Sequence, residues 1–150
     1  MAIRFIVKDG DPVLRKKSKP VEIFDEKLGT LLDDMAQTLR DADGCGLAAP
    51  QVGILKRAVI VDVGEGAIEL INPKIIAKSG VQEEMEGCLS CPGLYGTTRR
   101  PMNVTVRAQD RNGKEFSIKG SGLLARALCH EIDHLDGILF KDHAKNLMQE

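Results

Sequence analysis

Apolar residues recur at a helical interval between residues 25 and 39. Their positions follow i, i+3, i+4, i+7, i+8 and i+11, which places them on one face of a helix with 3.6 residues per turn. They are Leu28, Leu31, Leu32, Met35, Ala36 and Leu39. Asp25 stands at the N-cap, where its carboxylate can accept from free N–H groups of the first turn. We therefore predict an amphipathic helix that starts at Asp25 and ends before residues 41–44.

The same interval returns in the last part of the chain, from Ser121 onward. One side of this second predicted helix is apolar: Leu123, Leu124, Ala127, Leu128, Ile132 and Leu135. Gly137 is its expected C-cap, because glycine tolerates the left-handed backbone at which helices commonly end.

Shorter stretches have the composition of strands. Residues 58–63 are rich in valine and isoleucine, and residues 68–71 precede Asn72-Pro73. Residues 103–110 and 114–119 alternate and flank an Asn-Gly hairpin signal.

Residues 44–53, by contrast, contain three glycines, two alanines and one proline. This composition fits neither a helix nor a regular strand, and small residues let the backbone approach another group closely. We interpret the segment as a loop in which Gln51 is the one polar side chain available to point into a site.

Composition places the chain among ordinary globular proteins. Its 150 residues are 43% hydrophobic and 29% charged, with a net charge of −1. We predict one catalytic domain over residues 1–150, with an α+β fold in which antiparallel strands pack around the second helix. The charge gives no electrostatic reason to expect direct nucleic-acid binding or an anionic membrane as partner. The N-terminal apolar run is too short for a signal peptide and no segment approaches a membrane span, so we expect a cytoplasmic protein.

The second helix carries the chemistry, in the segment His130-Glu131-Ile132-Asp133-His134. Residues at i and i+4 lie on one face of a helix, so both imidazoles can reach one metal ion. Glu131 then lies beside the open side of the metal, where a carboxylate can move protons for a bound water. The alternative is a helix that happens to carry two surface histidines.

A catalytic metal usually has three protein ligands, and only a short polar stretch follows His134. The search for the third ligand therefore turns upstream, to Cys88, because a thiolate is a strong ligand for a borderline or soft metal. Cys91 offers a competing interpretation, a closed Cys2His2 structural zinc site. Against it, 38 residues separate Cys91 from His130, whereas a compact zinc finger uses about 12–15. A closed site would also leave Glu131 without a role.

Three segments together resemble the signature motifs of the peptide deformylases, in order and in approximate spacing. The motifs are G-x-G-x-A-A-x-Q at residues 44–51, E-G-C-L-S at residues 86–90 and H-E-x-D-H at residues 130–134. The resemblance implies one divalent metal ion held by Cys88, His130 and His134, foremost Fe²⁺, with Zn²⁺, Ni²⁺ or Co²⁺ as alternatives. It also implies a hydrolase that removes the formyl group from the formyl-methionine terminus of new polypeptides.

The same resemblance assigns roles to further residues. Glu131 is the expected general base and acid, and the Gln51 amide and the Leu89 N–H are expected to stabilise the oxyanion. The backbone around Gly46 is expected to pair with an extended peptide. The expected substrate-binding residues are Gly44, Cys45, Gly46 and Gly87. Glu86 and Asp133 are expected to orient ligands or to pair with an arginine.

Several alternatives stay open on the sequence. Arg126 is expected either at the mouth of the methionine pocket or in solvent. Tyr95 stands where many deformylases carry a peptide-holding arginine, which Arg99 or Arg100 can replace. A metallopeptidase that cuts internal amide bonds lacks its downstream ligand here, and a deformylase-like enzyme with another acyl specificity fits the same motifs. The sequence offers no support for contact with the ribosome.

Overall fold

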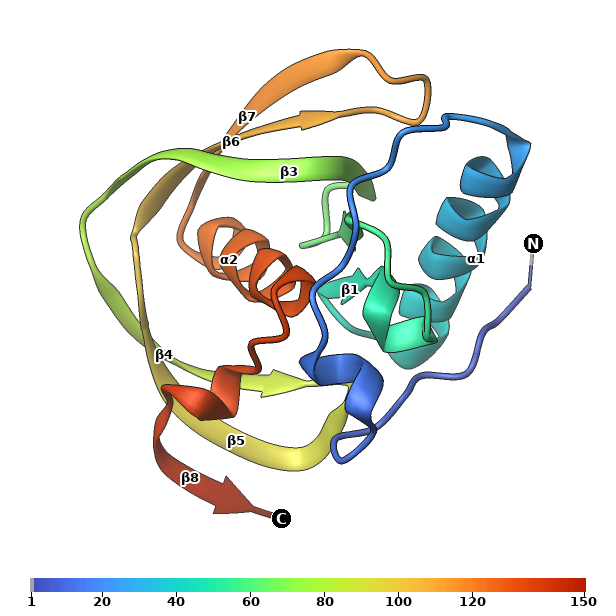
Figure 1. The fold of residues 1–150 in the computed structure, drawn as a ribbon. Helices are drawn as coiled ribbons and strands as arrows, with labels where there is room; N and C mark the ends of the chain where they lie inside the picture. Colours follow the sequence, from blue (N-terminus) through green and yellow to red (C-terminus); the bar gives the residue numbers. More distant parts are fainter. Residues whose placement is uncertain (1) are drawn as a thin grey trace.

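Two antiparallel sheets and two helices make up the part of the chain that the computed structural model describes, residues 2–150 (Figure 1). One sheet has the strand order β1-β2-β3-β6-β7 and the other the order β4-β5-β8. The helices are α1 (Glu26–Ala42) and α2 (Leu123–Leu135), and the 3₁₀ turns are η1 (Pro12–Arg15), η2 (Ala49–Val52) and η3 (Phe140–Asp142). The strands are β1 (Gly46–Ala48), β2 (Ala58–Val61), β3 (Ile68–Ser79), β4 (Gln82–Cys88), β5 (Cys91–Arg100), β6 (Asn103–Gln109), β7 (Glu115–Ser121) and β8 (Lys145–Gln149).

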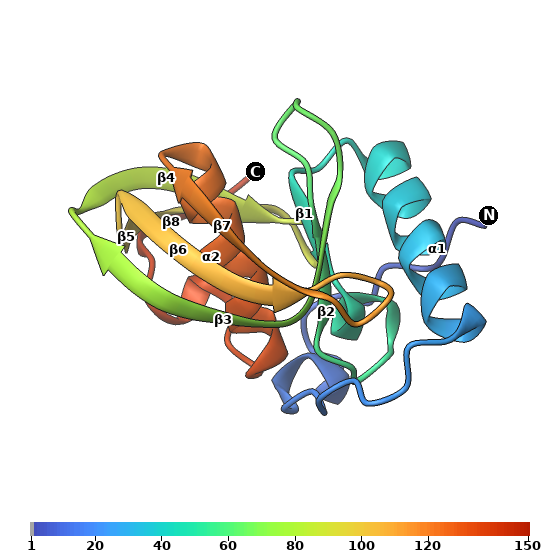
Figure 2. The same cartoon turned by 90° about the horizontal axis from the view of Figure 1, so that it is seen from above.

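The core is built on the two faces of β2. Successive side chains of a strand point to opposite faces, so Val59 and Val61 join the cluster around α2, while Ala58 and Ile60 join the cluster around α1. All four are fully buried. Figure 2 shows α1 and α2 on opposite sides of β1 and β2.

Helix α2 is the central helix of the fold. It packs on β1, β2 and β7 and also contacts β5, the middle strand of the other sheet. Strands surround it in Figure 1. The predicted arrangement, antiparallel strands around the second helix, is confirmed.

No helix within residues 2–150 combines the length and the apolar character needed to cross a membrane.

Both predicted helices form, with small shifts at their ends. The Asp25 carboxylate caps α1 by accepting from the N–H of Leu28 at 3.1 Å, and the helix continues three residues past Leu39. Helix α2 ends at Leu135, and its C-cap is Asp136, one residue before the predicted cap Gly137, which has a φ of +76°. The N–H groups of Gly137 and Ile138 donate to the carbonyls of His134 and Asp133, a Schellman closure.

The loop predicted for residues 44–53 is wrong in part. Gly46–Ala48 forms β1, which pairs with β2, and Ala49–Val52 forms the 3₁₀ turn η2. Three residues are too few for hydrophobic alternation to signal a strand. The long-range partner, β2, decides the conformation.

The strand predicted to end at residue 71 is longer than expected, because β3 continues to Ser79. The Asn72-Pro73 pair is absorbed by a register shift between Ile71 and Lys74, which is where a strand tolerates proline. Asn72 adopts a φ of +52°, and its side chain bonds to both backbone groups of Val21.

Besides β1, three strands were not predicted from the sequence: β4, β5 and β8. They form the smaller sheet, whose members are rich in charged, glycine and small polar residues. The β6–β7 hairpin, in contrast, forms as predicted around the Asn-Gly turn.

The glycine that follows the C-cap of α2 allows a test of protein stability. A Cβ on Gly137 would lie 2.5 Å from the backbone oxygen of Arg15, whereas one on Gly53, with a φ of +82°, would meet nothing within 4 Å. We expect Gly53→Ala to lower the free energy of unfolding by about 1 kcal/mol through left-handed strain alone. Gly137→Ala adds the overlap with Arg15, so its loss should be at least about 2 kcal/mol. Urea unfolding of the metal-free protein measures both, and equal losses would contradict the role of the Arg15 contact.

Candidate metal centre

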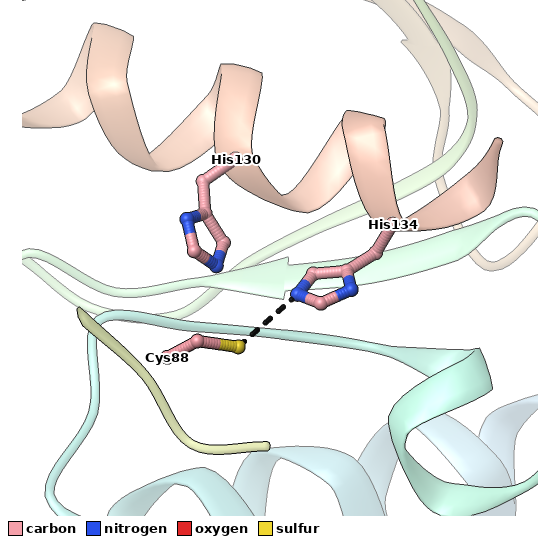
Figure 3. A group of neighbouring side chains, drawn as sticks. All are labelled: Cys88, His130 and His134. Carbon is pink, nitrogen blue, oxygen red and sulfur yellow. Dashed lines mark hydrogen bonds between the residues drawn. The ribbon is translucent and has the colours of Figure 1, made fainter. Parts of the chain in front are cut away.

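Helix α2 and the end of strand β4 bring three ligand side chains together. His130 and His134 project from one face of α2, and Cys88 is the last residue of β4. One ligand atom from each lies within 4.8 Å of the others, and Cys88 Sγ is 3.4 Å from His134 Nε2. Figure 3 shows both imidazoles directed from the helix toward the thiol.

A buried ionic network fixes the orientation of His130. Its Nδ1 lies 2.9 Å from Glu86 Oε1, so Nε2 is the nitrogen left to face the other two ligands. Arg100 donates to both carboxylate oxygens of Glu86 at 3.0 Å and to Asp133 Oδ2 at 2.7 Å. Thr98 also donates to Glu86. The expectation that Glu86 and Asp133 pair with an arginine agrees with this geometry.

Arg100 cannot serve as the peptide-holding arginine, contrary to one expectation. Its side chain is 5% exposed and is occupied by Glu86 and Asp133. Arg99 points to solvent and lies 3.7 Å from Glu83. Neither residue lines the pocket described below.

The network also sets the charge of its members. Burial alone would raise the pKa of Glu86, but hydrogen bonds from His130 and Arg100 outweigh it and hold that pKa far below its usual range. Burial and the neighbouring His130 lower the pKa of His134. His134 is therefore neutral near pH 7, the form in which an imidazole binds metal.

Cys88 has a neighbour in Cys91. The hydrogen bond with Cys91, burial and the negative charge of Glu131 all raise the pKa of the Cys88 thiol. A thiolate in this position needs a cation beside it. Cys91 is 6% exposed and packs with Leu14, Leu139 and Phe140 rather than joining the three-ligand group. This arrangement disfavours the closed Cys2His2 alternative.

Glu131 is buried beside His130, with its Oε2 4.0 Å from His130 Nε2. The residue is 4% exposed, and its Oε1 has no hydrogen-bond partner among residues 2–150. Burial raises the pKa of Glu131 to about 7. A buried carboxylate without a full set of partners is costly, which indicates that the site is built for a further group.

Gly46 lies directly against Glu131. A Cβ at this position would be 2.5 Å from Glu131 Oε2 and 2.7 Å from its Cγ. From the sequence, the backbone of Gly46 was expected to pair with a peptide, but its contact with Glu131 was not predicted. The glycine at position 46 of the first motif was a sign in the sequence that another group lies close to the backbone. That group, Glu131, is 85 positions away, and only the fold identifies it.

The Gln51 side chain is held at both ends. Its Oε1 accepts from the N–H of Ala48 at 2.9 Å, and its Nε2 donates to Ser90 Oγ at 3.1 Å and lies 3.6 Å from Cys88 Sγ. The amide therefore presents N–H groups to the side of the site that holds Cys88.

A pocket of about 530 Å³ opens above these groups. The predicted site residues in its wall are Gly44, Cys45, Gly46, Gln51, Gly87, Cys88, Leu89, His130 and Glu131. His134 is not part of the wall and is 1% exposed. Arg126 and Tyr95 also line the pocket. Arg126 Nη1 donates to Gln82 Oε1 at 2.9 Å. The position of Arg126 at the mouth of a methionine pocket stays a prediction. The apolar lining residues Met85, Leu94 and Leu123 were not anticipated.

The residues present fit a divalent metal ion. One sulfur and two imidazole nitrogens converge, a set that Fe²⁺, Zn²⁺, Ni²⁺ and Co²⁺ all accept. Three protein ligands leave a further position free for chemistry, as in catalytic metal sites. Glu131 lines the same pocket as Cys88 and His130.

Comparison with known proteins gives a consistent result. The profile of the family described as polypeptide deformylase matches residues 3–150. The peptide deformylase of Alkaliphilus metalliredigens is 62% identical over 142 residues, covering 95% of this chain and 97% of its own. That of Acetivibrio thermocellus is 57% identical over 150 residues, covering 100% of this chain and 88% of its own. The crystal structure of the Thermotoga maritima peptide deformylase superposes with a TM-score of 0.94 at 40% identity, covering 97% of this chain and 99% of the other.

Fold and site together define a hydrolase of the H-E-x-x-H type, in which a cysteine side chain lies beside the two histidines. More narrowly, the chain belongs to the peptide deformylase family. Members of this metal-dependent family remove the N-formyl group from the formyl-methionine terminus of newly made polypeptides.

The ligand set is tested by metal content. We expect Cys88→Ala to lose the bound Zn²⁺ or Co²⁺ of the reconstituted protein, because it removes one of the three converging atoms. Cys91→Ala should retain one ion per chain, since Cys91 lies outside that group. Elemental analysis after gel filtration measures both, with circular dichroism as the folding control. Loss of metal from both variants would favour the closed Cys2His2 site.

Proposed function

We propose that this chain, acting as one catalytic domain over residues 1–150, binds one divalent ion through Cys88, His130 and His134 and hydrolyses the formyl amide with Glu131. The observation that carries the proposal is the buried Glu131 carboxylate, whose Oε1 lacks a partner among the described residues. It borders the same pocket as Cys88 and His130. Fe²⁺ is the metal we propose, on the resemblance of the motifs to those of the family.

The proposed mechanism assigns proton transfer to Glu131. A bound divalent ion supplies Lewis acidity, which makes a water molecule nucleophilic near neutral pH and polarises the formyl carbonyl. Glu131 accepts the proton of the attacking water and later delivers a proton to the departing amine nitrogen. A pKa of about 7, raised by burial, suits a group that must both accept and donate near neutral pH.

The proposed oxyanion stabilisers are the Gln51 amide and the Leu89 backbone N–H. As the formyl carbon becomes tetrahedral, its oxygen gains negative charge and needs donors held in advance. The hydrogen bonds of Gln51 to Ala48 and Ser90 support this role, because they hold the amide without free rotation. Leu89 supports it by lining the pocket next to Cys88.

The proposed peptide site lies between two sheet edges. Strand β1 is the edge of the five-stranded sheet and β4 is an edge of the three-stranded sheet, and residues of both line the pocket. An extended peptide can add to such an edge through backbone hydrogen bonds. Gly44, Cys45 and Gly46 offer backbone on one side and Gly87 on the other. Met85 and Leu123 supply apolar surface for the methionine side chain.

The proposed working place is the cytoplasm, where formylated polypeptides emerge from ribosomes. Direct contact with the ribosome has no support from the sequence. Residues 145–149 form strand β8, which pairs with β5. We do not propose that the protein binds nucleic acid directly.

The decisive experiment measures formate release from a formyl-Met-Ala-Ser peptide by protein loaded with Fe²⁺ without oxygen. We expect Glu131→Gln to lower kcat about 10²- to 10⁴-fold, because proton transfer is lost while the metal ligands remain. Metal content should be unchanged. Glu84→Gln, on the exposed part of β4, is the matched control and should keep full activity.

Two further substrates separate the alternatives. Cleavage of an unformylated peptide would support an internal peptidase, and faster turnover of an acetylated peptide would support another acyl specificity. Absence of all three activities from a protein holding one ion per chain would contradict the proposed function.

The contact between Gly46 and Glu131 gives an independent prediction. In Gly46→Ala the new Cβ displaces the Glu131 carboxylate, and a displacement of about 1 Å can cost about 10²-fold in rate. We expect the loss in kcat with little change in KM, because the backbone that faces the peptide keeps its N–H and C=O groups. Steady-state kinetics measures both constants.

Gly44→Ala is the control for this variant. Its Cβ would meet the flexible end of the Leu89 side chain at 2.9 Å, which can move aside. If Gly44→Ala and Gly46→Ala lower kcat equally, the specific contact with Glu131 does not explain the effect.

A further inference from the structure

Cys91 has no role in the proposed hydrolysis, although it is paired with Cys88 across the β4–β5 hairpin. Both residues line the same pocket, so a small solute that reaches one can reach the other. The other two cysteines are elsewhere: Cys45 lines the pocket directly before β1, and Cys129 lies on α2 among core residues.

The hairpin places Cys88 and Cys91 opposite each other. They are paired residues at the junction of β4 and β5, separated only by the turn at Leu89 and Ser90. Directly opposed residues of antiparallel strands have Cα atoms about 4.5–5.5 Å apart and side chains on the same face. Disulfides span Cα separations of about 4.4–6.8 Å, a range that includes the separation of directly opposed residues. The register of the hairpin shifts between Gly87 and Cys88, and this shift brings Cys88 opposite Cys91.

We propose that Cys88 and Cys91 form a peroxide-oxidised dithiol site that converts the candidate metal ligand into a reversible disulfide. Peroxide is the oxidant: the Cys88 sulfur attacks it, the O–O bond breaks, the thiol proton passes to the departing oxygen, and the products are a sulfenic acid and water. The Cys91 sulfur then attacks the sulfenic sulfur, the S–S bond forms, and the S–O bond breaks with release of water. The two sulfurs together lose two electrons, which the peroxide gains as it becomes two waters.

The consequence rests on the proposed role of Cys88 as a ligand. A disulfide sulfur is no longer a thiolate, so only His130 and His134 would remain to hold the ion. Cys91 thereby acts as a resolving thiol. It stops oxidation at a stage that a dithiol reductant reverses, before Cys88 reaches the irreversible sulfinic or sulfonic acid.

Tryptic peptides make the test direct. Cleavage after lysine and arginine leaves Cys88 and Cys91 together in residues 79–99, Cys45 in residues 41–56 and Cys129 in residues 127–141. Metal-free protein is treated with a small excess of hydrogen peroxide, alkylated without reduction and digested. We expect peptide 79–99 to lose about 2 Da and to resist alkylation, both reversed by dithiothreitol. Oxygen on Met85, in the same peptide, adds mass and is distinguished by fragmentation.

Other patterns in the unmutated protein would overturn the proposal. They are alkylation of both thiols in peptide 79–99, a disulfide that joins Cys88 to Cys45, or two or three oxygens on Cys88 beside a free Cys91. These peptide masses are all measured on the unmutated protein, so a folding defect of a variant cannot obscure them.

The Cys91→Ser variant tests the resolving role. After peroxide and then dithiothreitol, we expect the unmutated protein to regain the thiolate-to-cobalt charge-transfer band on addition of Co²⁺. Cys91→Ser should not regain it, because Cys88 advances to the sulfinic or sulfonic acid. Cys129→Ser is the matched control and should recover like the unmutated protein. Equal recovery by Cys91→Ser would overturn the role of Cys91.

The cobalt band separates this inference from the proposed function. Its absence in the fully reduced, untreated protein would mean that Cys88 is not a metal ligand. A normal band in that protein, without the disulfide after peroxide, would overturn only the dithiol site.

Discussion

The buried ion pair between Glu86 and Arg100 is the interaction on which the site geometry depends. Glu86 lies two residues before Cys88 on β4, and the same carboxylate holds His130 Nδ1 on α2. Arg100, at the end of β5, extends the link to Asp133 on α2. The pair thus ties both strands of the hairpin to the helix that carries the imidazoles. Removing one partner of such a buried pair costs about 3–5 kcal/mol, because the other charge is left uncompensated.

This link explains why a small and polar sheet can hold a precise site. Strands β4, β5 and β8 bury few apolar side chains, and β8 is exposed along its whole length. The two larger hydrophobic clusters lie between α1, the larger sheet and α2. The smaller sheet has a small apolar cluster around Leu14, Cys91 and Phe140, and the ionic hydrogen bonds of Glu86 and Arg100 add a second connection to the rest of the fold.

Close packing around Glu131 places a second constraint on the fold. The carboxylate is surrounded by α2 and by β1, and only the absence of a Cβ at Gly46 leaves room for it. Burial that raises the pKa of Glu131 to about 7 follows from the same confinement. The three-residue strand β1 therefore serves the larger sheet, the pocket wall and the shape of the catalytic cavity at once.

The sequence by itself determined the features that depend on local periodicity and motif spacing. Helices α1 and α2 follow from apolar residues at helical intervals, and the β6–β7 hairpin follows from alternation around Asn112-Gly113. The i, i+4 spacing of His130 and His134 places them on one helical face. With the glycine-rich and cysteine motifs, this was sufficient to indicate the family and to select nine of the residues that line the pocket, although not its apolar residues Met85, Leu94 and Leu123.

Only the tertiary structure decided the features that depend on partners distant in the chain. The polar strands β4, β5 and β8 carry no alternation of their own and exist because they pair with one another. The choice of Arg100 as the partner of Glu86 could not be read from Arg99-Arg100, because neighbouring strand residues point to opposite faces and the register settles which one is buried. The contact of Gly46 with Glu131 has the same origin. Each is set by strand register and helix docking, which local sequence does not encode.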